Sequence, residues 1–158
     1  MSAASRKKAS NTKTRRRGNR VALVLDTGPI LALLDADDPD HTRCAALLDD
    51  LTEQLVVVAP TLVEIDYWIR KRLQLQVWTD FVDDIAKGAY RLEHLTADDM
   101  MRVAELEARY ADLELGMVDA SVMAVCERLD ERKVASLDDR HFRTVRPKHC
   151  PHFDLLPS

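Results

Sequence analysis

The feature that most constrains the fold is a series of short apolar runs separated by longer segments with helical spacing. VALVL (21–25) and LVVVA (55–59) contain no charged residue and are rich in β-branched side chains. Runs of this kind suit strands that are covered on both faces, as in a parallel sheet. YRLEHL (90–95), VASL (134–137) and FDLL (153–156) predict three more strands, the last of them at a sheet edge.

The segments between these strands predict helices. Pro29 and Pro60 lie near helix starts, where proline is tolerated, and Asp38 precedes another helix as its expected N-cap. Thr96 and Asp99 have the spacing of a capping box. Strands that alternate with helices predict an α/β fold, an α/β/α sandwich with a mostly parallel sheet of four to five strands. The predicted helices cover residues 27–35, 37–51, 60–73, 75–88, 96–110 and 117–129.

Charge divides the chain into two unequal parts. Residues 1–20 carry eight Lys or Arg and no acid, which leaves 15 basic against 27 acidic side chains in residues 21–158. The first part is polar and poor in apolar residues, which predicts a disordered basic tail: a solvated extension, a misplaced start or an arm for nucleic acid. Residues 21–158 have the size of one domain. An acidic domain that binds a polyanion needs a basic patch or metal ions.

The cysteines and the start of the chain bear on location. Cys44, Cys126 and Cys150 are odd in number, contain no C-x-x-C pair and follow no secretion signal. The apolar stretch after residue 20 is interrupted by Asp26 and Pro29, and no segment approaches the ~20 apolar residues of a membrane span. We therefore expect a cytoplasmic protein with reduced thiols and no membrane association.

Four carboxylates stand beside apolar residues. Asp26 and Asp138 directly follow the first and fourth predicted strands. Glu64 lies in the first turn of its helix, and Asp119 opens the most apolar helix. Sites in open α/β sheets lie at the carboxyl ends of the strands, so neighbouring first and fourth strands would bring two of these acids to one edge. Taken singly, each acid also fits a turn or a helix cap, and Asp138 or Asp139 would suit the start of a short helix.

A cluster of four carboxylates has to take up protons, find basic partners or bind a cation. Desolvating one carboxylate costs several kcal/mol, and like charges within ~4–6 Å raise each other's pKa. A site of oxygen ligands without Cys or His suits Mg²⁺, with Mn²⁺ as the alternative. Such ions are a common means of phosphodiester hydrolysis, and they would also let an acidic protein hold a polyanion.

Other interpretations of the acids fit less well. The tripeptide D-T-G (26–28) also occurs in aspartic proteases, but that chemistry needs strand-rich lobes, and this chain is rich in helix. A haloacid-dehalogenase-type phosphatase needs D-x-D after its first strand, where Gly28 takes the second position. A receiver-like module, which binds Mg²⁺ without catalysis, needs an acidic pair after that strand and a Lys after the fifth. We keep it as the alternative function.

With these residues in place, the chain resembles a known family. The order LDTGPILALLD, PTLVEIDYWI, LELGMVDASVMAVCERL and VASLDDRHF is similar to the PIN domain, and specifically to the VapC-type ribonuclease toxins of bacterial type II toxin-antitoxin pairs. The similarity covers residues 21–157. Two departures are Gly28, where Ser is common, and the basic tail, which is unusual. An inactive PIN domain kept for protein contacts is a further alternative, which the intact carboxylates argue against.

The resemblance implies a Mg²⁺- or Mn²⁺-dependent endoribonuclease that acts on structured RNA, either tRNA or rRNA. It implies that Asp26 and Asp119 are the firmest metal ligands, and that Glu64 and Asp138 complete the set of catalytic acids. Beside them, Thr27 and Ser136 match family hydroxyls that support the ligands. Basic residues after the fourth acid suit RNA phosphates, and the residues expected to contact RNA are Arg140, His141, Arg143 and Arg146.

The resemblance also implies protein partners, namely a second copy in a homodimer and a cognate VapB-type antitoxin that masks the acidic pocket. The sequence offers one loose indication, a group of apolar side chains on the helices of residues 60–88. They either form an exposed surface for a partner or pack against each other. The group consists of Tyr67, Trp68, Val77, Trp78 and Phe81.

Overall fold

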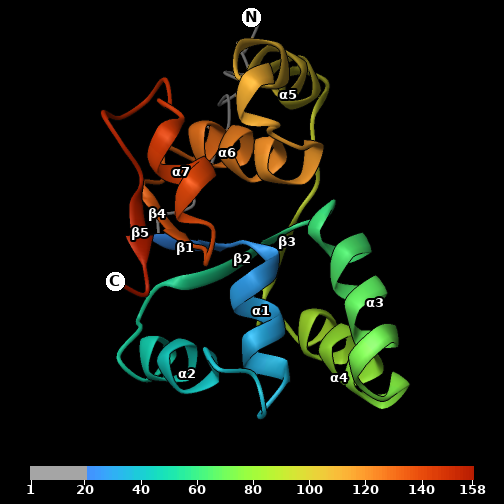
Figure 1. Cartoon of the computed structure of the whole chain (residues 1–158). Coiled ribbons are helices and arrows are strands. Elements are labelled where there is room, and N and C mark those ends of the chain that lie inside the picture. The colour runs from blue at the N-terminus through green and yellow to red at the C-terminus, as the bar shows by residue number, and fades with distance from the viewer. Residues whose placement is uncertain (1–20) are drawn as a thin grey trace, which may run out of the picture.

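The computed structural model describes residues 21–158, and its centre is a five-stranded sheet in which every strand pairing is parallel (Figure 1). The sheet order is β3-β2-β1-β4-β5, so β5 is an edge strand as expected. The α/β fold with four to five strands is confirmed. The basic tail of residues 1–20 lies outside the described residues. The strands are β1 (Ala22–Leu25), β2 (Gln54–Val58), β3 (Arg91–Glu93), β4 (Lys133–Ala135) and β5 (Asp154–Leu156).

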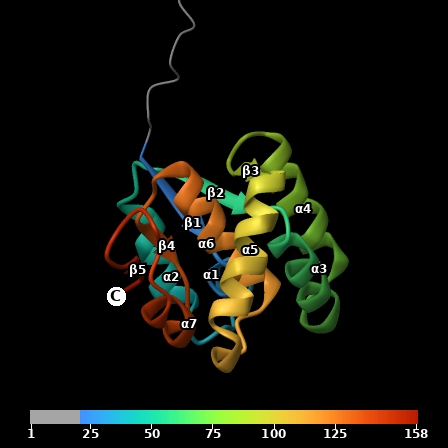
Figure 2. The ribbon, with the colours of Figure 1, turned by 90° about the horizontal axis from the view of Figure 1, so that it is seen from above.

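Helices cover both faces of the sheet, which confirms the sandwich (Figures 1 and 2). One face carries α1 (Thr27–Leu34), α2 (His41–Asp49), α3 (Thr61–Arg72) and α4 (Leu75–Ala86). The other carries α5 (Ala97–Arg109), the 3₁₀ turn η1 (Ala111–Leu113), α6 (Met117–Leu129) and α7 (Asp139–Thr144).

The strands divide their side chains between two apolar cores. In β1, Ala22 and Val24 belong to the core between the sheet and helices α5, α6 and α7. Leu23 and Leu25 point to the opposite face and belong to the core between the sheet and helices α1, α3 and α4. All four are buried, as a fully covered parallel strand requires. At roughly 1.5–3 kcal/mol for each buried Val or Leu, these layers hold the strands in place.

Capping predictions had mixed outcomes. Thr96 and Asp99 form the predicted capping box at the start of α5, and this prediction is confirmed. The prediction for Asp38 was wrong, because α2 begins at His41 with Asp40 as its N-cap. The Asp38 carboxylate instead accepts from the Asp40 N–H at 2.8 Å. This local turn uses the carboxylate before the helix starts.

The packing of α6 fixes one of the predicted site residues. Residues 120–126 of α6 are all buried, as the apolar segment predicted, and Asp119 stands in its first turn. A buried ion pair fastens α6 to α5: the Arg102 guanidinium donates twice to the Glu127 carboxylate, at 2.8 Å each. Two such charge-assisted bonds fix geometry as well as adding energy.

The strand order reverses at β1: β2 and β3 are added on one side of it, and β4 and β5 on the other. The Asp26 N–H, just past β1, donates to the Ala135 carbonyl at the end of β4 at 2.9 Å. The first and fourth strands are therefore neighbours, and the residues that follow them meet at one edge. Such a switch point is where open α/β sheets bind their ligands. Across residues 21–158, each helix is either too short or too polar to traverse a bilayer.

Candidate active site

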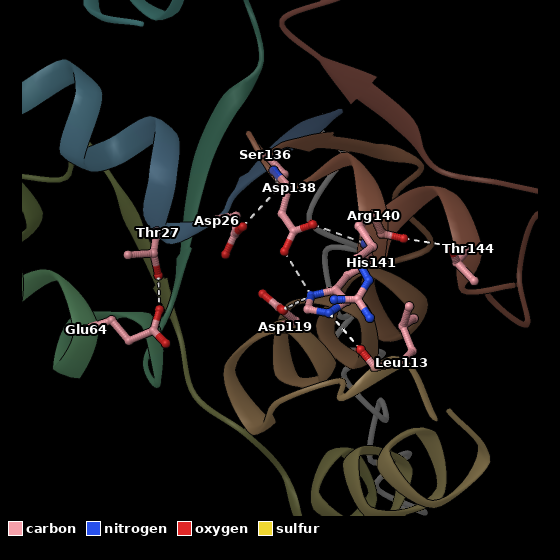
Figure 3. A network of polar contacts seen from close by, with 10 residues as sticks. All are labelled: Asp26, Thr27, Glu64, Leu113, Asp119, Ser136, Asp138, Arg140, His141 and Thr144. Carbon is pink, nitrogen blue, oxygen red and sulfur yellow. Dashed lines mark hydrogen bonds and ion pairs between the residues drawn. The ribbon is translucent and has the colours of Figure 1, made fainter. Parts of the chain in front are cut away.

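The four predicted acids converge on one open cleft at the carboxyl edge of the sheet (Figure 3). The cleft has a volume of about 670 Å³. Asp26 enters it after β1, Glu64 from α3, Asp119 from α6 and Asp138 before α7. Four segments from distant parts of the sequence thus contribute one carboxylate each. Other lining residues are Thr27, Gly28, Leu137, Asp139 and Arg140.

Asp26 is the most enclosed of these acids, with 5% of its surface exposed. It is the N-cap residue of α1, yet its side chain makes no capping hydrogen bond. Burial, followed by the nearby charge of Asp119, raises the pKa of Asp26 from 3.8 to about 7, although hydrogen bonds from the Thr27 backbone N–H and the Ser136 hydroxyl oppose the rise. Helix capping does not account for this carboxylate, because its side chain makes no capping hydrogen bond to α1.

Ser136 links two of the acids. The Ser136 hydroxyl donates to Asp26 Oδ2 at 2.9 Å, and the Ser136 Oγ atom accepts a hydrogen bond from the Asp138 N–H at 3.0 Å. The hydroxyl is buried at the end of β4, where it orients the Asp26 carboxylate and the chain that leads to Asp138. Thr27 acts in the same way on the opposite side of the cleft, because its hydroxyl donates to Glu64 Oε2 at 2.7 Å.

Asp119 and Asp138 share a contact with His141. The Nδ1 atom of His141 lies 2.6 Å from Asp119 Oδ2 and 2.9 Å from Asp138 Oδ2, and Nε2 lies 3.2 Å from the Leu113 carbonyl oxygen (Figure 3). All three partners are oxygen acceptors, so both ring nitrogens of His141 lie within hydrogen-bonding distance of an acceptor. Burial raises the pKa of Asp119, and the contact with His141 opposes that rise.

Asp138 has both of the roles that its place in the sequence allows, as a helix cap and as a member of the acidic cluster. Its Oδ1 accepts from the His141 N–H at 3.1 Å and so caps α7, while its Oδ2 faces the His141 ring. One oxygen therefore serves the helix, and the other belongs to the acidic cluster. A strand-end Asp can supply both because its two oxygens point to different partners.

The residues predicted to contact RNA are spread out. Arg140 lines the cleft, and His141 lies within the acidic cluster. Arg143 instead pairs with Asp139 at 3.2 Å, and the Arg146 guanidinium donates to the Arg143 carbonyl at 3.1 Å. The structure brings Arg140 and His141 to the acids, whereas Arg143 and Arg146 are engaged farther along the same segment.

The donor set fits a divalent cation. A carboxylate with so little exposure and a pKa of about 7 favours the approach of positive charge. Asp119, Asp138 and His141 each offer one atom within 4.8 Å of the other two. The two carboxylates are oxygen donors of the kind that the sequence predicts for Mg²⁺ or Mn²⁺, and the His141 ring stands beside them.

His141 was expected at RNA, which stays a prediction, and its contacts with Asp119 and Asp138 were not foreseen from the sequence. Its place three residues after Asp138 in a short helix puts both side chains on one face, and this spacing was the available signal. The other half of its environment, the Leu113 carbonyl, comes from a turn 28 residues earlier in the chain. No local pattern in the sequence reports that contact.

Comparison with known proteins gives the same assignment. The family model of the PIN domain matches residues 23–147. Ribonuclease VapC26 from Mycobacterium tuberculosis (strain ATCC 25618 / H37Rv) is 29% identical over 135 residues, which are 85% of this chain and 100% of that protein.

Two solved structures share the fold. VapC20 from Mycobacterium tuberculosis, a Sarcin-Ricin loop cleaving toxin, gives a TM-score of 0.69 at 22% identity over 74% of this chain and 90% of that one. A toxin-antitoxin complex from Klebsiella pneumoniae gives a TM-score of 0.62 at 14% identity, with 84% and 100% covered. The resemblance seen in the sequence is confirmed: with its acids gathered at the switch point and a family model covering most of its length, the chain belongs to the PIN domain family.

Proposed function

We propose that this protein is a divalent-metal-dependent endoribonuclease that acts as the toxin of a toxin-antitoxin pair. The observation that carries the proposal is the convergence of Asp26, Glu64, Asp119 and Asp138 on one cleft, with Asp26 buried and its pKa raised to about 7. An acidic cluster of this kind is suited to holding cations against a phosphodiester. We assign the nuclease to residues 21–158.

Asp26 and Asp119 are the proposed primary metal ligands, with Glu64 and Asp138 completing the set of catalytic acids. When bound, Mg²⁺ or Mn²⁺ would supply charge to activate a water molecule and to stabilise the departing oxygen. Ser136 and Thr27 hold the Asp26 and Glu64 carboxylates in position through their hydroxyls. His141 does the same for Asp119. Supporting hydrogen bonds of this kind affect metal affinity because they fix the orientation of the ligands.

Arg140 is placed to meet the substrate, because it is the basic residue that lines the cleft. Charge-assisted hydrogen bonds from its guanidinium would hold an RNA phosphate beside the acids. Because acids outnumber bases in residues 21–158, such a contact also helps to offset the electrostatic repulsion between the domain and RNA.

The named relatives support the substrate and partners. One is a ribonuclease and another cleaves the Sarcin-Ricin loop, so we propose a structured RNA substrate, rRNA or tRNA, recognised by the shape of its loop. The complex from Klebsiella pneumoniae pairs a toxin with an antitoxin, and we propose a VapB-type antitoxin and a homodimer for this chain. With a substrate of this kind, we propose a cytoplasmic location.

The test is cleavage of labelled RNA by the purified protein with Mg²⁺ or Mn²⁺, compared with EDTA. Asp119→Asn keeps the shape of the side chain but removes its charge, and we expect it to lower the rate by about 10²-fold or more. The matched control is Asp98→Asn, because Asp98 is an exposed acid in the first turn of α5. Its rate should equal that of the wild type.

Cleavage in EDTA, or an unchanged rate in Asp119→Asn, would overturn the proposed mechanism. A protein that binds Mg²⁺ but leaves every RNA intact would instead favour the inactive PIN domain or the receiver-like module.

A further inference from the structure

The exposed face of α3 next to the cleft carries two aromatic rings. Tyr67 and Trp68 follow Glu64 by three and four residues, and Lys71 follows it by seven, so all three side chains share its face of the helix. Tyr67 is 52% exposed and Trp68 is 37% exposed. Other members of the predicted aromatic group turn inward: Phe81 is buried and contacts the rings of Trp78 and Tyr90.

A positively charged side chain lies over each exposed ring. The Lys71 ammonium lies 5.6 Å from the centre of the Tyr67 ring, and the Arg72 guanidinium carbon lies 4.4 Å from the centre of the Trp68 ring. The two rings meet edge to face at 5.2 Å. We call Tyr67, Trp68, Lys71 and Arg72 the α3 strip.

The α3 strip carries uncompensated positive charge. Arg70 is paired with Asp66 at 2.8 Å, but neither Lys71 nor Arg72 forms an ion pair within residues 21–158. This local charge stands out in a domain where acids outnumber bases. A polyanion is therefore the partner that this surface attracts.

The α3 strip lies next to the active site, because Glu64 is on the same helix three residues before Tyr67. A helix rises ~1.5 Å per residue, so Trp68 lies roughly 6 Å along α3 from Glu64 and Arg72 roughly 12 Å. A nucleic acid strand with one phosphate at the acids would therefore pass its next nucleotides along this face of the helix.

We propose that the α3 strip binds unpaired nucleotides of the RNA substrate beside the scissile phosphate, with bases stacked on Trp68 and Tyr67 and phosphates held by Lys71 and Arg72. Aromatic rings beside a positively charged track are the usual elements of single-strand binding. Tyr, Trp and Arg are also common in protein interfaces, but Lys is depleted there, and the positive charge of Lys71 and Arg72 without acidic partners favours a polyanion. The choice of RNA as occupant rests on the proposed nuclease function.

The test measures binding rather than cleavage. Every protein carries Asp119→Asn so that the RNA stays intact, and the probe is a single-stranded RNA of about a dozen nucleotides containing one 2-aminopurine, whose fluorescence reports stacking. Trp68→Ala and Tyr67→Ala should each weaken binding ~5- to 150-fold and relieve the quenching, while Trp68→Phe should keep most of the affinity. Lys71→Gln and Arg72→Gln should each lower the slope of log affinity against log salt by ~0.7.

Val63→Ser and Leu75→Ser are the controls, because these exposed apolar residues flank the strip and would serve a protein partner instead. Both should leave RNA affinity unchanged. The proposal is wrong if the aromatic variants bind RNA as the parent does, or if they alter only the oligomeric state together with the two controls. Cleavage by the protein without Asp119→Asn is measured separately. If that protein cuts RNA and the strip variants retain full affinity, the strip alone is refuted. If that protein never cuts RNA and the strip variants lose binding, the nuclease function is refuted and the strip is supported.

Discussion

At the scale of the residue, the site depends on a charge that the fold encloses. Asp26 ends a strand whose four residues are buried, so its carboxylate has little water around it. Its pKa rises from 3.8 to about 7 for that reason. At ~1.4 kcal/mol per pH unit between the two values, ionised Asp26 destabilises the folded protein by up to roughly 4 kcal/mol.

This enclosed charge gives a prediction for stability against pH. The folded pKa exceeds the ordinary value, so the folded protein binds the proton more tightly, and stability is lost as pH rises from about 4 through 7. In EDTA, Asp26→Asn should therefore gain ~2 kcal/mol or more over the wild type at pH 8 compared with pH 4. Urea unfolding at both pH values measures the difference. A gain of the same size at both would show that Asp26 ionises as it does in water.

Some residues of the candidate site could be predicted from the sequence, and others could not. The four acids were recognisable because each stands at a strand end or helix start among apolar neighbours, and their family order strengthened the choice. The contacts of His141 were not recognisable, since its orientation depends on the Leu113 carbonyl from a distant turn. Arg143 and Arg146 were expected at RNA because they are basic and close in sequence, and this stays a prediction; at present Arg143 pairs with Asp139, and Arg146 donates to the Arg143 carbonyl.

At the scale of the element, α6 has to be held firmly for Asp119 to face the cleft. The buried pair of Arg102 and Glu127 fastens it to α5. Replacing Arg102 by Met keeps much of the side-chain volume but removes the guanidinium, so the part-buried Glu127 carboxylate keeps the Lys148 N–H as a donor and loses two bonds. We expect a loss of about 1.5–3 kcal/mol in the free energy of unfolding.

The matched control is Arg43→Met, because Arg43 forms an exposed pair with Asp40. That substitution should change the free energy of unfolding by less than ~1 kcal/mol. Chemical denaturation of both variants measures the difference. Equal losses would mean that burial adds nothing to the pair that joins α5 and α6.

Elements were predictable where local chemistry decides them. The apolar strands, the Thr96 capping box and the apolar helix α6 all follow from short patterns, and each is present. The start of α2 was not predictable from the pattern, because Asp38 and Asp40 are both good N-cap residues and only the folded turn chooses between them. Which aromatic side chains are buried, as Phe81 is, and which are exposed, as Trp68 is, also depends on how α3 packs against α4.

At the scale of the whole molecule, the order of the strands decides whether there is a site at all. Only a sheet with β1 beside β4 brings Asp26 close to Ser136 and Asp138. The sequence made that pairing a reasonable expectation, but the register that sets Leu25 against Ala135 comes from packing across the full sheet. The fold could be predicted more fully than the cleft for this reason: the fold follows from many repeated local signals, and the cleft from a few long-range contacts.

We expect a divalent cation to bind among these acids and to relieve their mutual repulsion. Isothermal titration of MnCl₂ and MgCl₂ into the purified protein without its partner measures this binding, with Asp26→Asn, Asp119→Asn and the exposed control Asp98→Asn alongside. We predict saturable uptake by the wild type and by Asp98→Asn, and affinity weakened by about 10-fold or more in the other two. Absence of uptake by the wild type, or equal uptake by all four proteins, would contradict this expectation.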